Sequence, residues 1–219
     1  MEKIIKIWEK YDFVFLQGLW GTVWMAGVVV LAGTIIGILV ALMRMSRSKI
    51  LNGISAVFVE VIRGTPILLQ LYFFWLALPK LLPFEMSDTA CIVVALIISS
   101  SAYISEIIRA GILAVDKGQT EAAQSLGLSH SNMMRRVILP QAIKNILPAL
   151  GNQFIQMVKE TSLASVFFVG ELMTSYKTVQ SATFLSLEPL IIAGIIYLML
   201  TFVLSKLVNL FERRLTISD

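Results

Sequence analysis

The chain is poor in the residue types that build most metal centres and disulfide scaffolds. Cys91 is the only cysteine and His130 the only histidine among 219 residues. A single cysteine excludes an intrachain disulfide and a thiol metal cluster. Charged residues make up 15% of the chain, against about 25% in ordinary soluble domains. These shortages argue against a metal centre and against a soluble domain.

Motifs for nucleotide hydrolysis and common enzyme chemistry are also missing. The sequence has no G-x-x-x-x-G-K-[ST] loop to cradle phosphates, so the chain is not itself an ATP-driven motor. It lacks the zinc-protease pattern H-E-x-x-H and the nucleophile elbow G-x-S-x-G. His130 lies in a polar segment, where a surface position is a better interpretation than a catalytic one. We therefore expect no catalytic residue, no metal and no cofactor in this chain.

What the sequence has in abundance is apolar residues in long runs. Hydrophobic residues form 57% of the chain, and the mean hydropathy is +0.82. The first run is too long for a signal-peptide core of about 7–15 residues, and a bilayer core takes about 20 residues of helix. The sequence predicts an all-α integral membrane protein, with residues 1–219 as a single transmembrane domain. The five predicted spans are residues 13–43, 57–78, 89–108, 142–158 and 189–210.

Lysine and arginine are unevenly divided between the two sides of such a bundle. Eleven lie in the loops after the first and third spans, in the ends of the spans that flank them and in the C-terminal segment. Five lie on the other side, namely Lys3, Lys6, Lys10, Lys80 and Lys177, and the count leaves out Arg63 and Lys159. Basic loops stay in the cytosol, so we expect the N-terminus outside and the C-terminus inside. The central segment, residues 110–141, is then cytosolic. A further apolar stretch, residues 162–170, predicts a half-span or a surface-lying helix.

Residues 110–141 carry the signals of two short helices joined by a turn. The stretch before Gly127 favours helix, and Gly127 suits the left-handed conformation that ends one. Ser129 can cap a second helix running to Leu139, and Pro140 fits the first turn of the next span. We call this helix pair the elbow. It is either an ordinary solvated loop or a docking element for a soluble partner.

The elbow also carries a spaced pattern formed by Glu121, Ala122, Ala123, Gly127, Val137, Leu139 and Pro140. This pattern resembles the signature loop of bacterial ABC importer permeases, with Val137 at an Ile-type position. Segments 59–66, 102–111, 115–119 and 159–163 resemble motifs of the polar amino acid uptake subfamily. That subfamily contains histidine, glutamine, arginine and cystine permeases.

The resemblance implies a dimeric core in the bacterial cytoplasmic (inner) membrane, formed with a second copy or a homologous permease. Two cytosolic ATPase subunits would carry the ATP and magnesium, and an extracytoplasmic binding protein would deliver the amino acid. The partners would thus be proteins and the lipid bilayer, with no nucleic acid. The ATPase-coupling residues would be Glu121, Ala122, Ala123, Gly127, Leu139 and Pro140.

Two charged pairs recur at the inner ends of the second and third predicted spans. Glu60 with Arg63, and Glu106 with Arg109, have the i, i+3 spacing that puts both side chains on one helix face. We hypothesise that the four charges form an inner-gate cluster that latches the closed gate. The alternative is ordinary interfacial pairing with snorkelling side chains.

Polar side chains deeper in the spans predict the solute path, because such groups are costly in lipid and usually face the bundle interior. Gln153, Gln156 and Glu160 form one stripe on the fourth span. For serines, close packing between helices is a strong alternative. The other candidates for the path are Thr65, Ser99 and Ser100.

The character of this stripe favours a neutral substrate. Glu160 could accept the ammonium of an amino acid, while the neutral Gln153 and Gln156 would suit a neutral polar side chain. A cationic side chain would need a further acid, because a buried unpaired charge is costly. We expect import of glutamine or cystine by alternating access, with basic amino acids as the alternative. A stand-alone secondary transporter or channel is the rival from another class, and inverted repeats would be its common sign.

Overall fold

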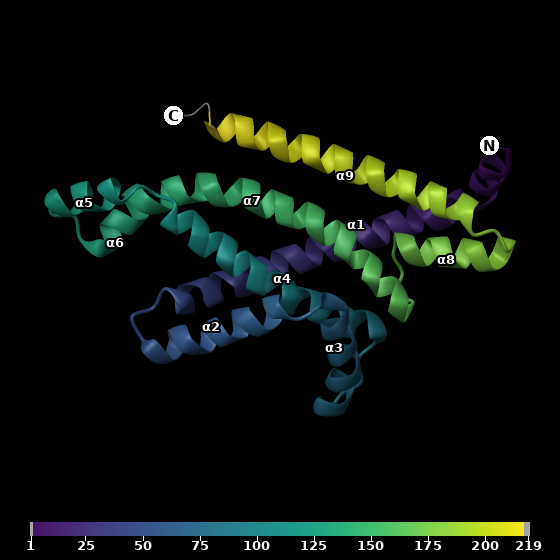
Figure 1. Cartoon of the computed structure of the whole chain (residues 1–219), viewed down its shortest axis with the longest axis horizontal. Helices are drawn as coiled ribbons and strands as arrows, with labels where there is room; N and C mark the ends of the chain where they lie inside the picture. The colour runs from purple at the N-terminus through teal and green to yellow at the C-terminus, as the bar shows by residue number, and fades with distance from the viewer. Residues whose placement is uncertain (1, 217–219) are drawn as a thin grey trace.

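A computed structural model describes residues 2–216, and the side chains of residues 2–214. Over this range the regular secondary structure is helical, which confirms the predicted all-α class (Figure 1). The start of α1 and the end of α9 lie toward opposite ends of the molecule (Figure 1). The elements in order are α1 (Glu2–Arg44), α2 (Lys49–Gly64), α3 (Ile67–Leu81), α4 (Asp88–Leu113), α5 (Lys117–Ser125), α6 (His130–Met133), η1 (Met134–Ile138), α7 (Leu139–Glu160), η2 (Thr161–Phe167), α8 (Leu172–Thr183) and α9 (Leu187–Thr216).

Three helices, α1, α4 and α9, are each long and apolar enough to cross a membrane. Helix α1 starts well before residue 13, because the mixed-charge N-terminal segment continues the same helix. Helix α7 has 22 residues, which is about 33 Å of helix, but it is less apolar than these three. The count of five spans and the inside–outside orientation therefore stay predictions.

The second predicted span is not one helix. The chain bends by 110° between α2 and α3, so residues 57–78 belong to two helices rather than to one. Pro66 disfavours helical geometry in the residue before it, and Thr65 is extended, with φ −114° and ψ 146°. Pro66 also has no N–H for the carbonyl of Ile62. The side chain of Gln70 replaces it, with Nε2 donating to Ile62 O at 2.6 Å.

The same amide also makes hydrogen bonds at the break between α2 and α3. Gln70 Nε2 also donates to the carbonyl of Thr65 at 3.1 Å and to its hydroxyl at 3.0 Å. Three acceptors around one nitrogen fix the orientation of the amide, since an oxygen there would have no donor to meet. Gln70 is 6% exposed. The broken span is thus held by a buried glutamine that replaces missing backbone hydrogen bonds.

The apolar stretch around residues 162–170 differs from one of the two expectations for it. It begins as a 3₁₀ helix, η2, with buried Thr161 and Ala164, so it does not lie on the surface of the molecule. The half-span stays a prediction. Phe167 draws it inward by packing edge-on against Tyr72, with ring centroids 4.8 Å apart, and against Trp75 at 5.4 Å. Helix α8, which follows, was not predicted. Its moderate polarity hides it from a search for apolar runs.

Helices α1 and α4 approach closely through small residues. A Cβ on Gly33 would lie 3.1 Å from the Ser100 side chain, and one on Gly37 would lie 2.9 Å from Ile104. Ser99 and Ser100 are 1% and 0% exposed. This geometry favours the packing alternative for Ser100, because its hydroxyl is pressed against α1. A core of Met25, Val29, Ile92, Leu96 and their neighbours continues the same contact.

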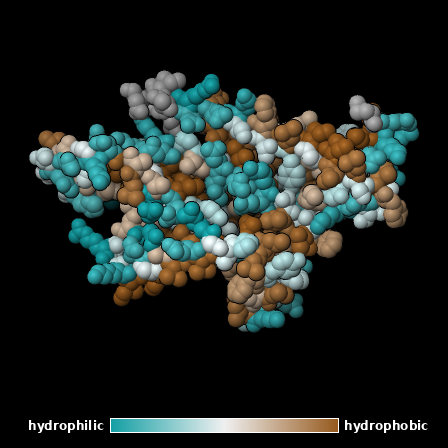
Figure 2. All heavy atoms as spheres, viewed as in Figure 1, coloured by the Kyte–Doolittle hydropathy of each residue, from teal (hydrophilic) through white to brown (hydrophobic). Residues whose placement is uncertain are grey.

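Much of the outer surface is apolar, as expected for a protein surrounded by lipid or by other helices. Figure 2 shows apolar side chains exposed over α2 and α3. They include Ile50, Ile54, Val57, Leu69 and Phe73, all more than half exposed. In the apolar window of α9 only 11% of the residues are buried. The fold therefore presents its hydrophobic residues outward as well as inward.

Candidate functional site: the elbow, a charge cluster and a polar stripe

The elbow projects from one end of the molecule, the end toward which the turn between α1 and α2 also lies (Figure 1). Asp116 caps α5, its Oδ1 accepting from the N–H of Gly118 at 2.7 Å. Gly127 ends α5 in the left-handed region, at φ +74°. Ser129 caps α6, its hydroxyl oxygen accepting from Asn132 N–H at 3.4 Å. The bend at Gly127 and the cap at Ser129 confirm the local sequence signals.

The second arm of the elbow does not end at Leu139. From α6 the backbone stays helical through a π-helical turn, η1, and runs directly into α7. Leu139 N–H bonds to the carbonyl of Met134, five residues back. Pro140 explains the wider turn, because it cannot donate to Arg136 and a π-turn adjusts the helix around the missing bond. The arm and α7 therefore form one continuous rod.

A small apolar core holds the two arms together. Ala123, Met133 and Ile138 are 3–4% exposed, and Ile112, Leu128 and Val137 pack around them. Ala123 thus faces inward, although it was predicted among the ATPase-coupling residues. Glu121 and Ala122 are exposed on the outer side of α5, as is Pro140 at the start of α7. Leu139 is half-buried.

The tip of the elbow carries a residue that sequence reasoning missed. Leu126, directly before the bend, is 81% exposed. A large apolar side chain at such a position is available for a hydrophobic contact with another protein. The sequence contained a clue to this exposure. A leucine directly before a glycine that ends a helix lies at a bend, where few neighbouring residues can cover it.

The predicted inner-gate charges gather around one carboxylate. Glu106 accepts two hydrogen bonds from Arg109, Nε–Oε1 at 3.0 Å and Nη2–Oε2 at 2.8 Å. Arg63 Nη1 lies 3.6 Å from Oε2, and Arg44 Nε lies 3.9 Å from Oε1. Arg63 also stacks over the ring of Tyr103 at 5.5 Å. Helices α1, α2 and α4 therefore meet at Glu106.

The cluster differs from the expected one in two members. Arg44 belongs to it and was missed, because its helix seemed to end in an ordinary basic loop. Glu60 lines the same cavity of about 360 Å³, but its side chain is exposed, and within residues 2–216 no ion pair to it is found. The charges that line the cavity are balanced, with Arg44 and Arg63 against Glu60 and Glu106.

The polar stripe on α7 is present as a set of neighbouring side chains. Gln156 Nε2 donates to Glu160 Oε1 at 3.1 Å. Gln153 and Glu160 are half-buried, and Gln156 is exposed. Thr65 lies at the break between α2 and α3, with its hydroxyl donating to Val61 O at 2.8 Å. The stripe lies in the half of α7 remote from the elbow.

A second carboxylate, Glu171, organises the end of the molecule remote from the elbow. It is fully buried and caps α8, accepting from the N–H of Met173 at 2.7 Å and of Thr174 at 2.6 Å. Tyr197 of α9 donates to it at 2.8 Å. Burial raises the pKa of this carboxyl. Sequence reasoning passed over Glu171 because nothing near it in sequence suggests burial.

A family profile for the "Binding-protein-dependent transport system inner membrane component" matches residues 33–217, which is most of the chain. The chain belongs to this family. This permease is 42% identical over 204 residues to the arginine transport system permease protein ArtQ of Bacillus subtilis (strain 168), across 93% of each chain. It is 38% identical over 212 residues to the glutamine transport system permease protein GlnP of Escherichia coli (strain K12), across 96% of each.

Solved structures agree with this assignment. A crystal structure of an amino acid ABC transporter with histidines superposes with a TM-score of 0.90 at 47% identity, covering 94% of the permease and 95% of that chain. An inward-facing structure of the MetNI methionine ABC transporter reaches a TM-score of 0.79 at 17% identity, covering 94% and 98%. The second likeness supports the fold alone.

The permease is therefore the multi-pass, inner-membrane transport subunit of an amino acid ABC importer and is not an enzyme. The predicted family, the inner-membrane location and the dependence on a binding protein are confirmed. Membership of this family excludes the stand-alone secondary transporter and the channel.

Proposed function

We propose that the permease imports a neutral polar amino acid, with glutamine as the first candidate. The observation that supports this most directly is the stripe on α7. Glu160 is its only acid, and the neighbouring amides of Gln153 and Gln156 are neutral hydrogen-bonding groups. One carboxylate matches one ammonium, which is what a zwitterion with a neutral side chain requires.

Arginine is the second candidate, and the similarity to an arginine permease favours it. A guanidinium needs its own acceptors once it leaves water. In this stripe the side-chain oxygens of Gln153 and Gln156 would have to supply them. The two candidates therefore differ in the hydrogen bonds that Gln153 and Gln156 would make: arginine needs both side chains as acceptors, whereas glutamine can use them as donors or acceptors.

The proposed path comprises Thr65, Gln153, Gln156 and Glu160. Ser99 and Ser100 of α4 are buried, and the close approach of Ser100 to Gly33 favours a packing role for it. In alternating access, nucleotide binding by the partner ATPases would move the elbow, and α7 would carry that movement to the stripe. ATP can shift the equilibrium only if it binds one conformation more tightly. ATP and magnesium would be bound by the partner subunits, and none of this chemistry would fall to the permease. The elbow would thus lie on the cytosolic side.

Uptake by the complete transporter in proteoliposomes tests this assignment. We expect excess unlabelled glutamine to abolish uptake of labelled glutamine and an equal excess of arginine to leave at least half of it. Glu160→Gln should raise the KM for uptake of either substrate at least tenfold, because both carry the ammonium. Stronger competition by arginine would replace the first candidate with the second. An unchanged KM in Glu160→Gln would remove Glu160 from the path.

A further inference from the structure

Helices α7 and α9 enclose an apolar groove near the end of the molecule that carries the elbow. Its volume is about 380 Å³. A Cβ on Gly151 would lie 2.7 Å from a methyl group of Val208, so the two helices touch at this level and the groove opens beside the contact. Apart from two charged residues, Glu212 and Arg214, its lining is apolar: Leu147, Pro148, Gly151, Val208 and Phe211.

The groove faces away from the proposed solute path. Successive residues of an α-helix are about 100° apart around its axis. Leu147 and Gly151 therefore lie on the face of α7 opposite Gln153 and Gln156. A ligand in the groove would not be a transported amino acid on its way through the stripe.

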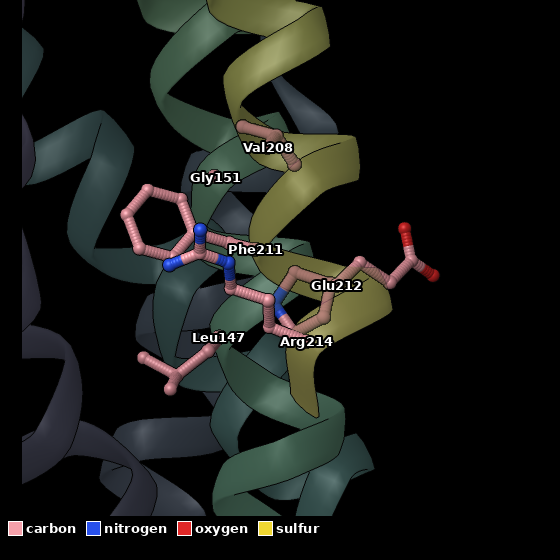
Figure 3. Close-up of a pocket in the computed structure, with 7 residues that line it drawn as sticks. Leu147, Gly151, Val208, Phe211, Glu212 and Arg214 are labelled. Atoms are coloured by element: carbon pink, nitrogen blue, oxygen red, sulfur yellow. The ribbon is translucent and has the colours of Figure 1, made fainter. Parts of the chain in front are cut away.

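The charge in the groove is at one end. Val208, Phe211 and Arg214 follow one another at three-residue intervals along α9, so the lining passes from apolar to cationic within two turns. Figure 3 shows the guanidinium of Arg214 on the same side of α9 as Leu147 and Phe211. The carboxylate of Glu212 points the other way (Figure 3). The exposed end of the groove thus offers a positive group.

We propose that this groove binds one anionic phospholipid, with an acyl chain along Leu147 and Phe211 and its phosphate on Arg214. The lipid is favoured as the occupant because α9 is long and apolar enough to cross a membrane, and only 11% of the residues in its apolar stretch are buried. Guanidinium groups pair with phosphate through charge-assisted hydrogen bonds. Basic pockets between membrane helices are typical sites for acidic headgroups.

Native mass spectrometry of the complete transporter, titrated with phosphatidylglycerol or phosphatidylcholine, tests the site. We expect one retained phosphatidylglycerol per permease chain and at least tenfold weaker retention of phosphatidylcholine. Arg214→Gln should weaken phosphatidylglycerol retention about tenfold. Arg213→Gln is the matched control, since Arg213 does not line the groove, and it should change retention less than twofold.

A second variant tests the apolar part. Leu147 is 46% exposed at the edge of the groove, so Leu147→Trp should fill it without disturbing a packed core. We expect this variant to lose the retained lipid while keeping a wild-type melting temperature. Equal retention of both lipids, or equal losses in the two arginine variants, would overturn the site. The site would also be overturned if no lipid is retained when the ATPase is bound, because the groove would then be a contact surface for that protein.

Discussion

Glu106 is the residue on which the most elements of the permease converge. It holds a bidentate pair with Arg109 and lies within 3.9 Å of two further arginines from α1 and α2. A carboxylate that meets three cations is difficult to replace, because its removal leaves like charges close together. Glu60, the other acid of the cavity, has no such position.

This difference gives a prediction for two conservative variants. Glu106→Gln should lower the free energy of unfolding by about 1–3 kcal/mol, since charge-assisted hydrogen bonds are lost among partly buried groups. Uptake should fall at least tenfold. Thermal unfolding and transport assays measure both, and Glu60→Gln, with its exposed side chain, should behave like the wild type. Equal effects of the two variants would instead support the cluster predicted from the sequence, in which Glu60 and Glu106 contribute alike.

Leu126 permits a second prediction at the level of a side chain. Because it is 81% exposed, Leu126→Ala should leave the melting temperature of the permease unchanged. If the tip of the elbow contacts the ATPase, the variant should weaken co-purification of that subunit about tenfold, as truncation of a central apolar contact does. Phe184→Ala is the control, because Phe184 is 93% exposed at the other end of the molecule. Wild-type assembly of Leu126→Ala would exclude the tip from the interface.

Among the elements, the broken span depends on a single side chain. Gln70→Leu removes the donor that serves Ile62 O and leaves buried carbonyls unpaired at the break. We expect a loss of about 1–3 kcal/mol in the free energy of unfolding. Thr65→Val is the milder control, because it removes only one of the three acceptors of that amide. If Gln70→Leu leaves the free energy of unfolding unchanged, water must supply the hydrogen bonds that the amide of Gln70 donates.

The bend of the elbow is also a property of an element. Gly127 has φ +74° and open space around its Cα, so only backbone strain opposes a side chain there. A β-branched residue in this conformation costs about 1–3 kcal/mol. Gly127→Val should therefore insert normally and retain ATP hydrolysis but lose most uptake. Gly127→Asn should keep uptake, since asparagine tolerates the left-handed region.

The elements also show where sequence reasoning succeeds and where it stops. The Gly127 bend and the Ser129 cap were predictable, because they depend on local backbone preferences. Pro66 marks the place of the break in the sequence, but the angle of the break and the hydrogen bonds from Gln70 that replace the missing one depend on tertiary packing. Helix α8 has an apolar face, with Leu172, Tyr176 and Val179 at i, i+4 and i+7, but it is too short and too polar to be found among long apolar runs. The burial of Glu171 has no local signal in the sequence. Arg44 joined the charge cluster only through the folding of α1 against α4.

At the scale of the whole molecule, the distribution of basic residues predicts the topology. The permease suits a labelling test, because its single cysteine, Cys91, is buried. A cysteine introduced at Gln124 in the elbow should react with a membrane-impermeant maleimide only in inside-out vesicles. One introduced at Phe184 should react only in right-side-out vesicles. Reactivity of both from the same side would contradict the predicted N-out, C-in arrangement.

The unbroken helical path from α6 through η1 into α7 has a mechanical consequence. From Leu139 to Glu160 the helix measures about 33 Å. If it tilts as a rigid body about its elbow end, a rotation of roughly 10° displaces Glu160 by about 6 Å, close to one helical turn. A small rotation of α7 at the elbow would thus move Glu160 by a distance comparable to the length of an amino acid substrate.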